Sequence, residues 1–261
     1  MDELRMGMLK GKVAIVTGTG SGIGRATAEH FAQQGAKVVV AERNAQSGQE
    51  TADKINSAGR EAIFCLTDVS QASQVEAAVQ RAVEHFGGLD ILVNNAAVQV
   101  LSKLADTSEA DWDRTHNVNL KGVFLGCKYA IPVMKQAGGG AIVNIASVLG
   151  FVADPDLAAY CAAKGGVISL TKVAALTYGP DNIRVNCICP GDVETPLVQE
   201  YFDKDPDPAR LRNEIYSKYA LRRIASPLEV ARTAAFLASG DSSFITGSAV
   251  VVDGGLTIKC Y

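Results

Sequence analysis

The sequence lacks any apolar run of the length that a membrane span or a signal peptide needs. Its longest apolar stretches, near residues 13–17 and 249–252, have the length of a β-strand. The formal net charge is only −3, so bulk charge gives no basis for binding a nucleic acid. These absences predict a cytoplasmic protein with neither a membrane nor a nucleic acid as a partner.

Histidines and paired cysteines are also scarce. The chain has three scattered histidines, and its six cysteines include no CxxC pair, so the sequence shows no ligand cluster of the zinc type. We therefore predict no metal site and cysteines that stay reduced. Cys187 and Cys189 flank one residue inside an apolar run, so their side chains should point to the same face of a strand.

Apolar residues, in contrast, are plentiful. Of the 261 residues, 48% are hydrophobic and 25 are glycine. A chain of this length can bury about three quarters of the surface that it exposes when unfolded, which provides an ample core. The high apolar fraction and the small net charge exclude a disordered chain. Because no change in composition marks a linker, we predict a single domain over residues 1–261, for cofactor binding and catalysis together.

Short apolar runs rich in β-branched residues alternate with longer amphipathic stretches. The runs are almost continuously hydrophobic, which is typical of strands buried on both faces of a parallel sheet. Regular alternation predicts an α/β fold with a doubly wound, Rossmann-like sheet and helices on both faces. Strands are predicted at 12–17, 37–41, 62–66, 89–93, 141–145, 183–188 and 249–252. Helices are predicted at 23–34, 71–86, 108–136, 158–178 and 227–238, and a further helix follows the second strand and ends at residue 58.

A glycine-rich turn separates the first predicted strand from the first predicted helix. Gly18, Gly22 and Gly24 lie in this turn together with Ser21 and Ile23. Because glycine has no Cβ, such a turn lets a phosphate approach the free backbone N–H groups at a helix N-terminus. At the first β–α junction this pattern predicts a dinucleotide site.

The residue at the end of the second predicted strand bears on the choice of cofactor. Glu42 lies 24 residues after Gly18, and a carboxylate there can accept hydrogen bonds from the adenosine ribose hydroxyls. It would also repel the additional phosphate of NADP. Arg43 follows directly and could pair with that phosphate, which leaves NADP open. We predict NAD as the cofactor.

A serine, a tyrosine and a lysine are placed for acid–base chemistry. Tyr160 and Lys164 are four residues apart on a predicted helix and share one face. A lysine ammonium stabilises a nearby phenolate, and an oxidised nicotinamide adds a second positive charge. Lowering a tyrosine pKa from about 10 to about 7 requires roughly 4 kcal/mol. Ser147 follows a predicted strand, at the sheet edge where ligands bind. The trio favours interconversion of an alcohol and a carbonyl.

With these residues in place, the sequence resembles the single-domain branch of the short-chain dehydrogenases/reductases. The resemblance implies that Tyr160 is the general acid/base and that Lys164 lowers its pKa and binds the nicotinamide ribose. It also implies that Ser147 polarises the substrate oxygen and that Asn119 holds a water linking the lysine to solvent. The resemblance runs from residue 10 to 255 and is carried by residues 17–24, 68–69, 94–96, 119, 147, 160–164, 190–191 and 253–255.

The resemblance implies further cofactor contacts. Asp68 matches an acidic residue that binds the adenine amino group, and Val69 would pack near that ring. Asn95 either shapes the cofactor cleft or only ties its strand to a neighbour. Ala97 replaces the glycine that the family usually has, and its Cβ could narrow the cleft. The cofactor residues implied are Gly18, Ser21, Gly22, Ile23, Gly24, Glu42, Arg43, Asp68, Val69, Asn95, Ala96, Tyr160, Lys164, Pro190, Gly191, Val193 and Thr195.

Residues 192–217 break the β–α rhythm because they are rich in proline and acidic residues, and we predict that they form a lid over the substrate. The predicted lining mixes polar and apolar groups, which favours a small polyhydroxylated compound such as a sugar or polyol. A hydroxy acid, a steroid and a cyclic diol remain open. The predicted substrate residues are Gln99, Ser147, Leu149, Tyr160, Asp192, Glu194 and Val198.

The sequence thus predicts an NAD(H)-dependent oxidoreductase that interconverts a secondary alcohol and its ketone by hydride transfer. Arg43 and the pattern FITGSAVVVDGG at residues 244–255 support a second hypothesis, an NADPH-dependent 3-oxoacyl-thioester reductase that acts on an acyl carrier protein. A hypothesis of another class is a nucleotide-binding redox sensor without catalysis, although the four expected catalytic positions are intact. From the resemblance and the small, apolar helix that begins at residue 158, we predict a homotetramer.

Overall fold

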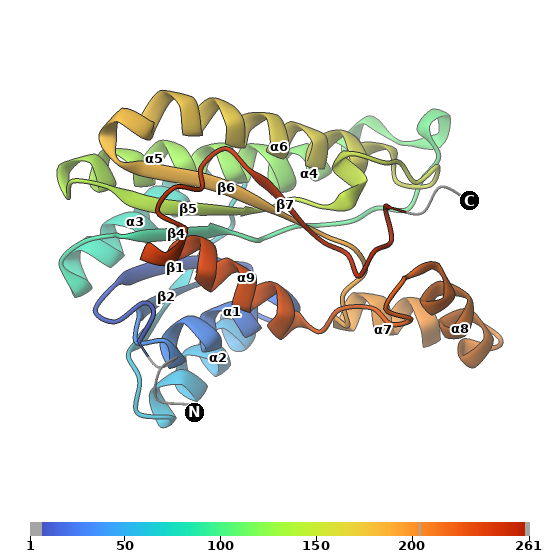
Figure 1. Cartoon of the computed structure of the whole chain (residues 1–261), viewed down its shortest axis with the longest axis horizontal. Coiled ribbons are helices and arrows are strands. Elements are labelled where there is room, and N and C mark those ends of the chain that lie inside the picture. The colour runs from blue at the N-terminus through green and yellow to red at the C-terminus, as the bar shows by residue number, and fades with distance from the viewer. Residues whose placement is uncertain (1–6, 204, 259–261) are drawn as a thin grey trace.

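The computed structural model describes residues 7–203 and 205–258, and within them seven parallel strands form one sheet in the order β3-β2-β1-β4-β5-β6-β7 (Figure 1). The order reverses between β1 and β4, which makes the sheet doubly wound as the sequence predicts. The strands are β1 (Val13–Thr17), β2 (Lys37–Glu42), β3 (Ala62–Leu66), β4 (Ile91–Asn94), β5 (Gly140–Ile145), β6 (Ile183–Pro190) and β7 (Ala249–Val252).

Helices cover both faces of the sheet. On one face α1 and α9 pack against each other, with α2 beside them, and on the other face lie α3, α5 and α6 (Figure 1). Successive residues of β1 enter opposite cores, Ala14 and Val16 on the α1 side, and Val13 and Ile15 on the α5 side. This explains the continuous hydrophobic runs. The helices are α1 (Gly22–Gln33), α2 (Ala45–Ser57), α3 (Ala72–Phe86), α5 (Gly122–Gln136), α6 (Ala158–Tyr178) and α9 (Pro227–Ala238).

The helix predicted over 108–136 is interrupted. It consists of α4 (Glu109–His116), one π-helical turn at Asn117–Lys121, and α5. The amide of Asn119 in this turn both accepts from the N–H and donates to the C=O of Val98, each at 2.8 Å. The π-helical turn thus coincides with a contact to a loop 21 residues earlier in the chain. Helical periodicity reports only on residues within the helix, so it does not predict this interruption.

The segment predicted as a lid carries two helices, α7 (Pro196–Asp203) and α8 (Pro208–Lys218). Proline marks a break inside a helix but suits its first turn, where its missing N–H costs nothing, and both helices begin at a proline. The two helices lie beyond the end of the sheet, next to the carboxyl end of β6 (Figure 1). Their inner side packs around Phe202, Tyr219 and Ile224, which are buried.

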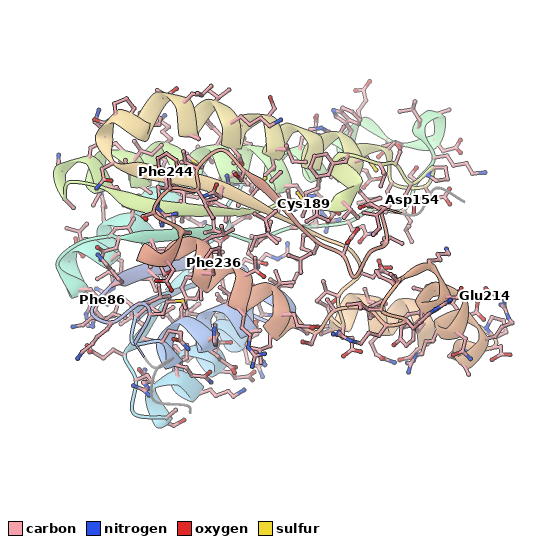
Figure 2. All side chains as sticks on the ribbon, viewed as in Figure 1. Phe86, Asp154, Cys189, Glu214, Phe236 and Phe244 are labelled. Carbon is pink, nitrogen blue, oxygen red and sulfur yellow. The ribbon has the colours of Figure 1, made fainter. Side chains whose placement is uncertain are left out.

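The cysteines follow the expectation for free thiols in the described residues. Cys187 and Cys189 lie on the same side of β6, in the core shared with α6, and Figure 2 labels Cys189 there. Both are fully buried, and neither forms a disulfide. Cys260 lies outside the described residues.

Candidate active site

One cleft of about 1640 Å³ opens at the carboxyl ends of the strands, between the glycine turn, the start of α6 and the segment predicted as a lid (residues 192–217, called the lid below). Asn119 and Glu194 are the predicted site residues that do not line it. The cleft is lined by the following predicted residues: Gly18, Ser21, Gly22, Ile23, Gly24, Glu42, Arg43, Asp68, Val69, Asn95, Ala96, Gln99, Ser147, Leu149, Tyr160, Lys164, Pro190, Gly191, Asp192, Val193, Thr195 and Val198.

The glycine turn leaves the N-terminus of α1 open to the cleft. Gly18 and Gly22 have φ angles of +70° and +53°, which L side chains rarely adopt. A Cβ at Gly24 would collide with the carbonyl oxygen of Gly18. Ser21 is the N-cap residue, yet its side chain makes no capping hydrogen bond, and the first turn carries no acidic residue. The first N–H groups of α1 have neither an intrahelical partner nor a side-chain cap, so they can bind an anionic group such as a pyrophosphate.

Two carboxylates lie at the far end of the cleft from the lid. Glu42 is 9% exposed and accepts from the N–H groups of Gly20 at 2.8 Å and Asn44 at 3.0 Å. Asp68 accepts from the N–H and the hydroxyl of Ser70. Each carboxylate retains lone pairs that can accept from a ribose or an adenine. This end is also lined by three residues that were not predicted: Asn44, Ser47 and Ser70. Asn44 and Ser70 each follow a predicted residue directly in the sequence, and Ser47 lies in the first turn of α2.

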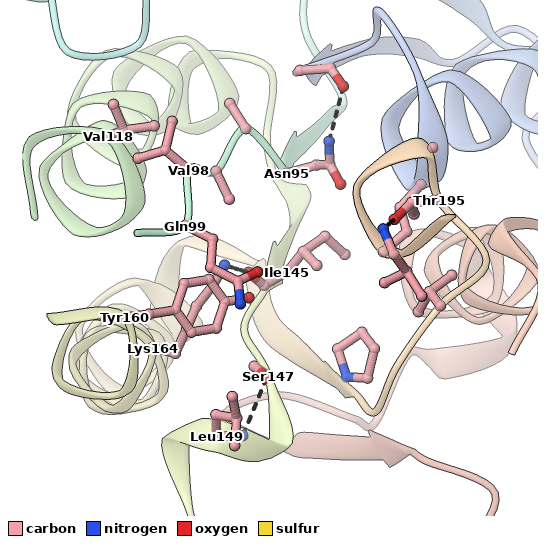
Figure 3. Close-up of a pocket in the computed structure, with 18 of the residues that line it drawn as sticks. Asn95, Val98, Gln99, Val118, Ile145, Ser147, Leu149, Tyr160, Lys164 and Thr195 are labelled. Atoms are coloured by element: carbon pink, nitrogen blue, oxygen red, sulfur yellow. Dashed lines mark hydrogen bonds between the residues drawn. The ribbon is translucent and has the colours of Figure 1, made fainter. Parts of the chain in front are cut away.

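Asn95 ties β4 to the glycine turn. Its side-chain amide donates to the carbonyl oxygens of Thr17 at 2.9 Å and Gly18 at 3.1 Å. Figure 3 draws the contact with Gly18. The hydroxyl of Thr17 accepts in turn from the N–H groups of Asn95 and Ala96. These contacts hold the turn in shape, so the bracing role that the sequence left open for Asn95 is present. Ala97 also lines the cleft, together with the residues that follow it in the loop after β4.

Asn119 is fully buried and does not line the cleft. Both polar atoms of its amide bind the backbone of Val98, and this contact fixes the loop that carries Gln99 into the cleft. Its side chain is therefore already engaged. A water link to Lys164 of the kind that the resemblance implies would have to use the main chain of the π-helical turn.

Ser147, Tyr160 and Lys164 meet where β5 ends and α6 begins (Figure 3). The ammonium of Lys164 is buried, donates to the carbonyl oxygen of Ile145 at 2.7 Å and lies 5.5 Å from the ring centre of Tyr160. The hydroxyl oxygen of Ser147 accepts from the N–H of Leu149 at 3.1 Å. This contact uses a lone pair of the serine and leaves its proton for another acceptor.

Burial shifts the pKa values of the tyrosine and the lysine in opposite directions. It raises the pKa of Tyr160 to about 12, which a hydrogen bond with Ser147 partly offsets and the charge of Asp192 increases. It lowers the pKa of Lys164 to about 8, because a buried ammonium loses hydration. The chain's own groups thus keep Tyr160 a neutral phenol at pH 7. The sequence argument assigns the lowering of this pKa to Lys164 together with an oxidised nicotinamide, and without that second positive charge desolvation keeps the pKa of Tyr160 above its ordinary value.

A further group of predicted residues lies at the end of β6 and directly after it. Pro190 ends the strand, and Gly191, Asp192 and Thr195 follow it along the cleft. Val193 is buried and pairs with Ala225 in an isolated bridge. Glu194 uses its N–H in the same pairing, is exposed, and points no group into the cleft, so its predicted substrate contact is absent from the lining.

These features fit a nicotinamide dinucleotide. The uncapped turn of α1 suits the pyrophosphate, the carboxylates suit the adenosine, and the opposite end places Tyr160 and Ser147 near Pro190 and Gly191. Among residues 7–203 and 205–258 no group of three or more His, Cys, Asp or Glu side chains is placed to hold a metal ion.

Comparisons with known proteins place the chain among oxidoreductases. A family model described as enoyl-(acyl carrier protein) reductase matches residues 18–257. A cyclohexanol dehydrogenase of an Acinetobacter species is 40% identical over 99% of this chain and 100% of its own length. A cis-4-hydroxycyclohexanecarboxylate dehydrogenase of Sinomonas cyclohexanicum is 42% identical over 94% and 96%.

The fold has a close counterpart among solved structures. The crystal structure described as a putative short-chain dehydrogenase/reductase from Burkholderia xenovorans has a TM-score of 0.93 and 38% sequence identity, and the match covers 98% of this chain and 100% of that one. The family match over most of the chain, the relatives and this structure agree with one another. This protein belongs to the short-chain dehydrogenase/reductase family, whose members are oxidoreductases that use NAD or NADP.

Proposed function

We propose that this protein is an NAD(H)-dependent dehydrogenase that interconverts an alicyclic secondary alcohol and its ketone. The observation that carries the proposal is the meeting of Ser147, Tyr160 and Lys164 in the same cleft as the uncapped N-terminus of α1. Two relatives at about 40% identity are named for the oxidation of cyclohexane rings that bear a hydroxyl group, which supports this substrate class.

The proposed chemistry divides between the cofactor and three side chains. When bound, the nicotinamide exchanges a hydride with the carbon of the alcohol or ketone. Tyr160 exchanges the proton with the substrate oxygen, and Ser147 donates a hydrogen bond to that oxygen. The ammonium of Lys164 lies 5.5 Å from the Tyr160 ring, where it stabilises the phenolate that forms each time the tyrosine gives up its proton.

The lining around Tyr160 supports an aliphatic ring as the substrate. Apolar side chains line this end of the cleft from the loop after β4, the loop before α6, the lid and the segment after β7. A cyclohexane ring buries its apolar surface against such groups, while its hydroxyl meets Ser147 and Tyr160. The apolar lining at this end comprises Val98, Leu149, Val152, Leu157, Val198, Phe202, Ile215 and Leu256.

The choice of NAD rests on Glu42. Its carboxylate is held by the N–H groups of Gly20 and Asn44 at the adenosine end of the cleft. There it would accept hydrogen bonds from the ribose hydroxyls of NAD and repel the additional phosphate of NADP. We expect oxidation of cyclohexanol to show a kcat/KM with NAD at least about 100-fold above that with NADP, and the substitution Glu42→Gln to reduce this ratio about tenfold or more. Initial rates of absorbance at 340 nm measure both.

The matched control is Glu50→Gln, since Glu50 is an exposed carboxylate on α2 that pairs with Arg25 and does not line the cleft. It should keep the wild-type ratio. A preference of the unaltered protein for NADP would contradict the assignment of Glu42. That result would favour the second candidate function, an NADPH-dependent 3-oxoacyl-thioester reductase, because Arg43 also lines the cleft. Tight NAD binding without turnover of any alcohol would favour the redox sensor.

The assembly and the cellular location stay predictions. None of the described helices is long and apolar enough to cross a membrane. The outer faces of α5 and α6 expose Phe124, Val173 and Leu176, with Leu176 83% exposed. Such side chains suit burial against a second copy of the chain, which supports the homotetramer that the sequence predicts.

A further inference from the structure

Tyr219 joins the lid to the floor of the cleft. It follows α8 directly and is 2% exposed. Its hydroxyl accepts from the N–H of Asp192 at 2.8 Å and donates to Oδ2 of the same residue at 2.7 Å. A Cβ at Gly191 would lie 3.1 Å from this hydroxyl, so the glycine is what lets the tyrosine approach so closely. The lid thereby fixes the direction of the Asp192 carboxylate.

Asp192 itself faces the reacting end of the cleft. It lines the cleft with Tyr160, and its charge contributes to the raised pKa of that tyrosine. The carbonyl oxygen of Asp192 accepts from the N–H of Ala225, so its main chain is held as well. Within the described residues no protein donor is bonded to Oδ1 of Asp192. A carboxylate oxygen only accepts hydrogen bonds, so a donor on the ligand is the partner that it can take.

This inference rests on the proposed function and names the substrate more closely. We propose that Asp192, oriented by Tyr219, accepts a hydrogen bond from a second hydroxyl group of the substrate, so that alicyclic diols are preferred over simple alcohols and over hydroxy acids. Hydrogen bonds to a charged acceptor are stronger than those between neutral groups, and a substrate carboxylate would be repelled. Asp192 is thus a specificity-determining residue, and Tyr219 is its positioning residue.

Lys218 and Arg114 are cations that compete with this reading. Both line the cleft, but both are exposed, and no hydrogen bond or ion pair of either charged group is recorded within the described residues. A substrate carboxylate therefore gains little from these solvated, unrestrained cations, whereas Asp192, although also exposed, is held in place by Tyr219 and repels it.

The test compares cyclohexanol, the 1,2-, 1,3- and 1,4-cyclohexanediols and cis-4-hydroxycyclohexanecarboxylate. We expect at least one diol to exceed cyclohexanol in kcat/KM by about tenfold or more, and the carboxylate to fall below cyclohexanol. Calorimetry in the presence of NADH measures the binding of the same compounds without turnover. If no diol binds or reacts better than cyclohexanol, the inference is overturned.

Three variants locate the effect. Asp192→Asn should lower the ratio of diol to cyclohexanol kcat/KM about tenfold and improve the relative rate with the carboxylate. Tyr219→Phe should lower the same ratio by less, through a higher KM for the diol. A general loss of structure would instead lower kcat/KM for the diol and for cyclohexanol alike. Asp154→Asn is the matched control, because Asp154, labelled in Figure 2, is a second carboxylate that lines the cleft but contacts the N–H of Asp156 rather than Tyr219.

The outcomes separate this inference from the proposed function. If Asp154→Asn lowers the ratio as much as Asp192→Asn, a diffuse negative potential selects the substrate and the assignment of Asp192 is overturned. If no compound is oxidised, the proposed function fails. Diol binding that is tighter than cyclohexanol binding and is weakened by Asp192→Asn would then still support the assignment.

Discussion

Replacing Tyr160 with phenylalanine is expected to lower kcat for alcohol oxidation by about 10³-fold or more while the dissociation constant of NADH stays nearly the same. The substitution removes one oxygen atom and keeps the ring that packs beside Lys164. Ser147 still offers a hydrogen bond, but the phenol that exchanges the proton with the substrate oxygen is gone. Steady-state rates at 340 nm measure kcat, and fluorescence titration measures NADH binding.

Tyr178→Phe is the matched control for this variant. Tyr178 ends the same helix, α6, is only partly exposed and does not line the cleft. It should retain the wild-type kcat, which shows that loss of a hydroxyl from α6 is harmless elsewhere. Wild-type turnover in Tyr160→Phe would remove Tyr160 from the mechanism, and another group would have to carry the proton.

The substitution Lys164→Met is expected to reduce kcat about 10²–10³-fold and to change how stability depends on pH. The side chain of Lys164 is buried, and its pKa falls from 10.5 to about 8 on folding. Between these two values the unfolded chain binds more protons than the folded protein, so the free energy of unfolding rises with pH. Below pH 8 the folded protein bears the full desolvation cost of the charged ammonium.

The difference between the two proteins isolates this group, because all other titrating groups are shared. Relative to Lys164→Met, wild-type stability should rise between pH 8 and 10.5, and an upper bound on the change is about 3 kcal/mol at 1.36 kcal/mol per pKa unit. Loss of the hydrogen bond to Ile145 shifts the whole curve without changing its slope. Urea unfolding at several pH values measures it. Parallel curves would mean that Lys164 is not desolvated as described.

The sheet could be predicted from the sequence because its signal is local. Each strand is a run of four to eight mostly hydrophobic residues, and the inner strands β1, β2, β4, β5 and β6 are buried on both faces. The lid helices could not be predicted in the same way. Pro196 and Pro208 are typical of loops, and their position in a first helical turn is visible only once the helices that follow are known. The π-helical turn depends on Val98, which lies outside the helix.

In the candidate site, too, residues with a local sequence signal could be predicted, and residues placed by distant contacts could not. Glycines, carboxylates and the Tyr160–Lys164 pair follow strand ends, and parallel strands bring their carboxyl ends to one edge, so these residues could be predicted together. Glu194 was misplaced because its N–H pairs with Ala225 and its side chain is exposed outside the lining, whereas Asp192 lines the cleft. The contact between Asp192 and Tyr219 joins residues 27 apart through the fold of the lid, and no sequence pattern indicates it.

The central claim is that this chain moves a hydride from the carbinol carbon of an alicyclic alcohol to NAD. The most direct measurement uses cyclohexanol with deuterium at carbon 1, together with NAD and the unaltered protein, followed by mass spectrometry of both products. The account predicts cyclohexanone without deuterium and NADH with one deuterium, formed in equal amounts. Ketone formed while the NADH carries no deuterium, or no ketone from any of the cyclic alcohols, would contradict it.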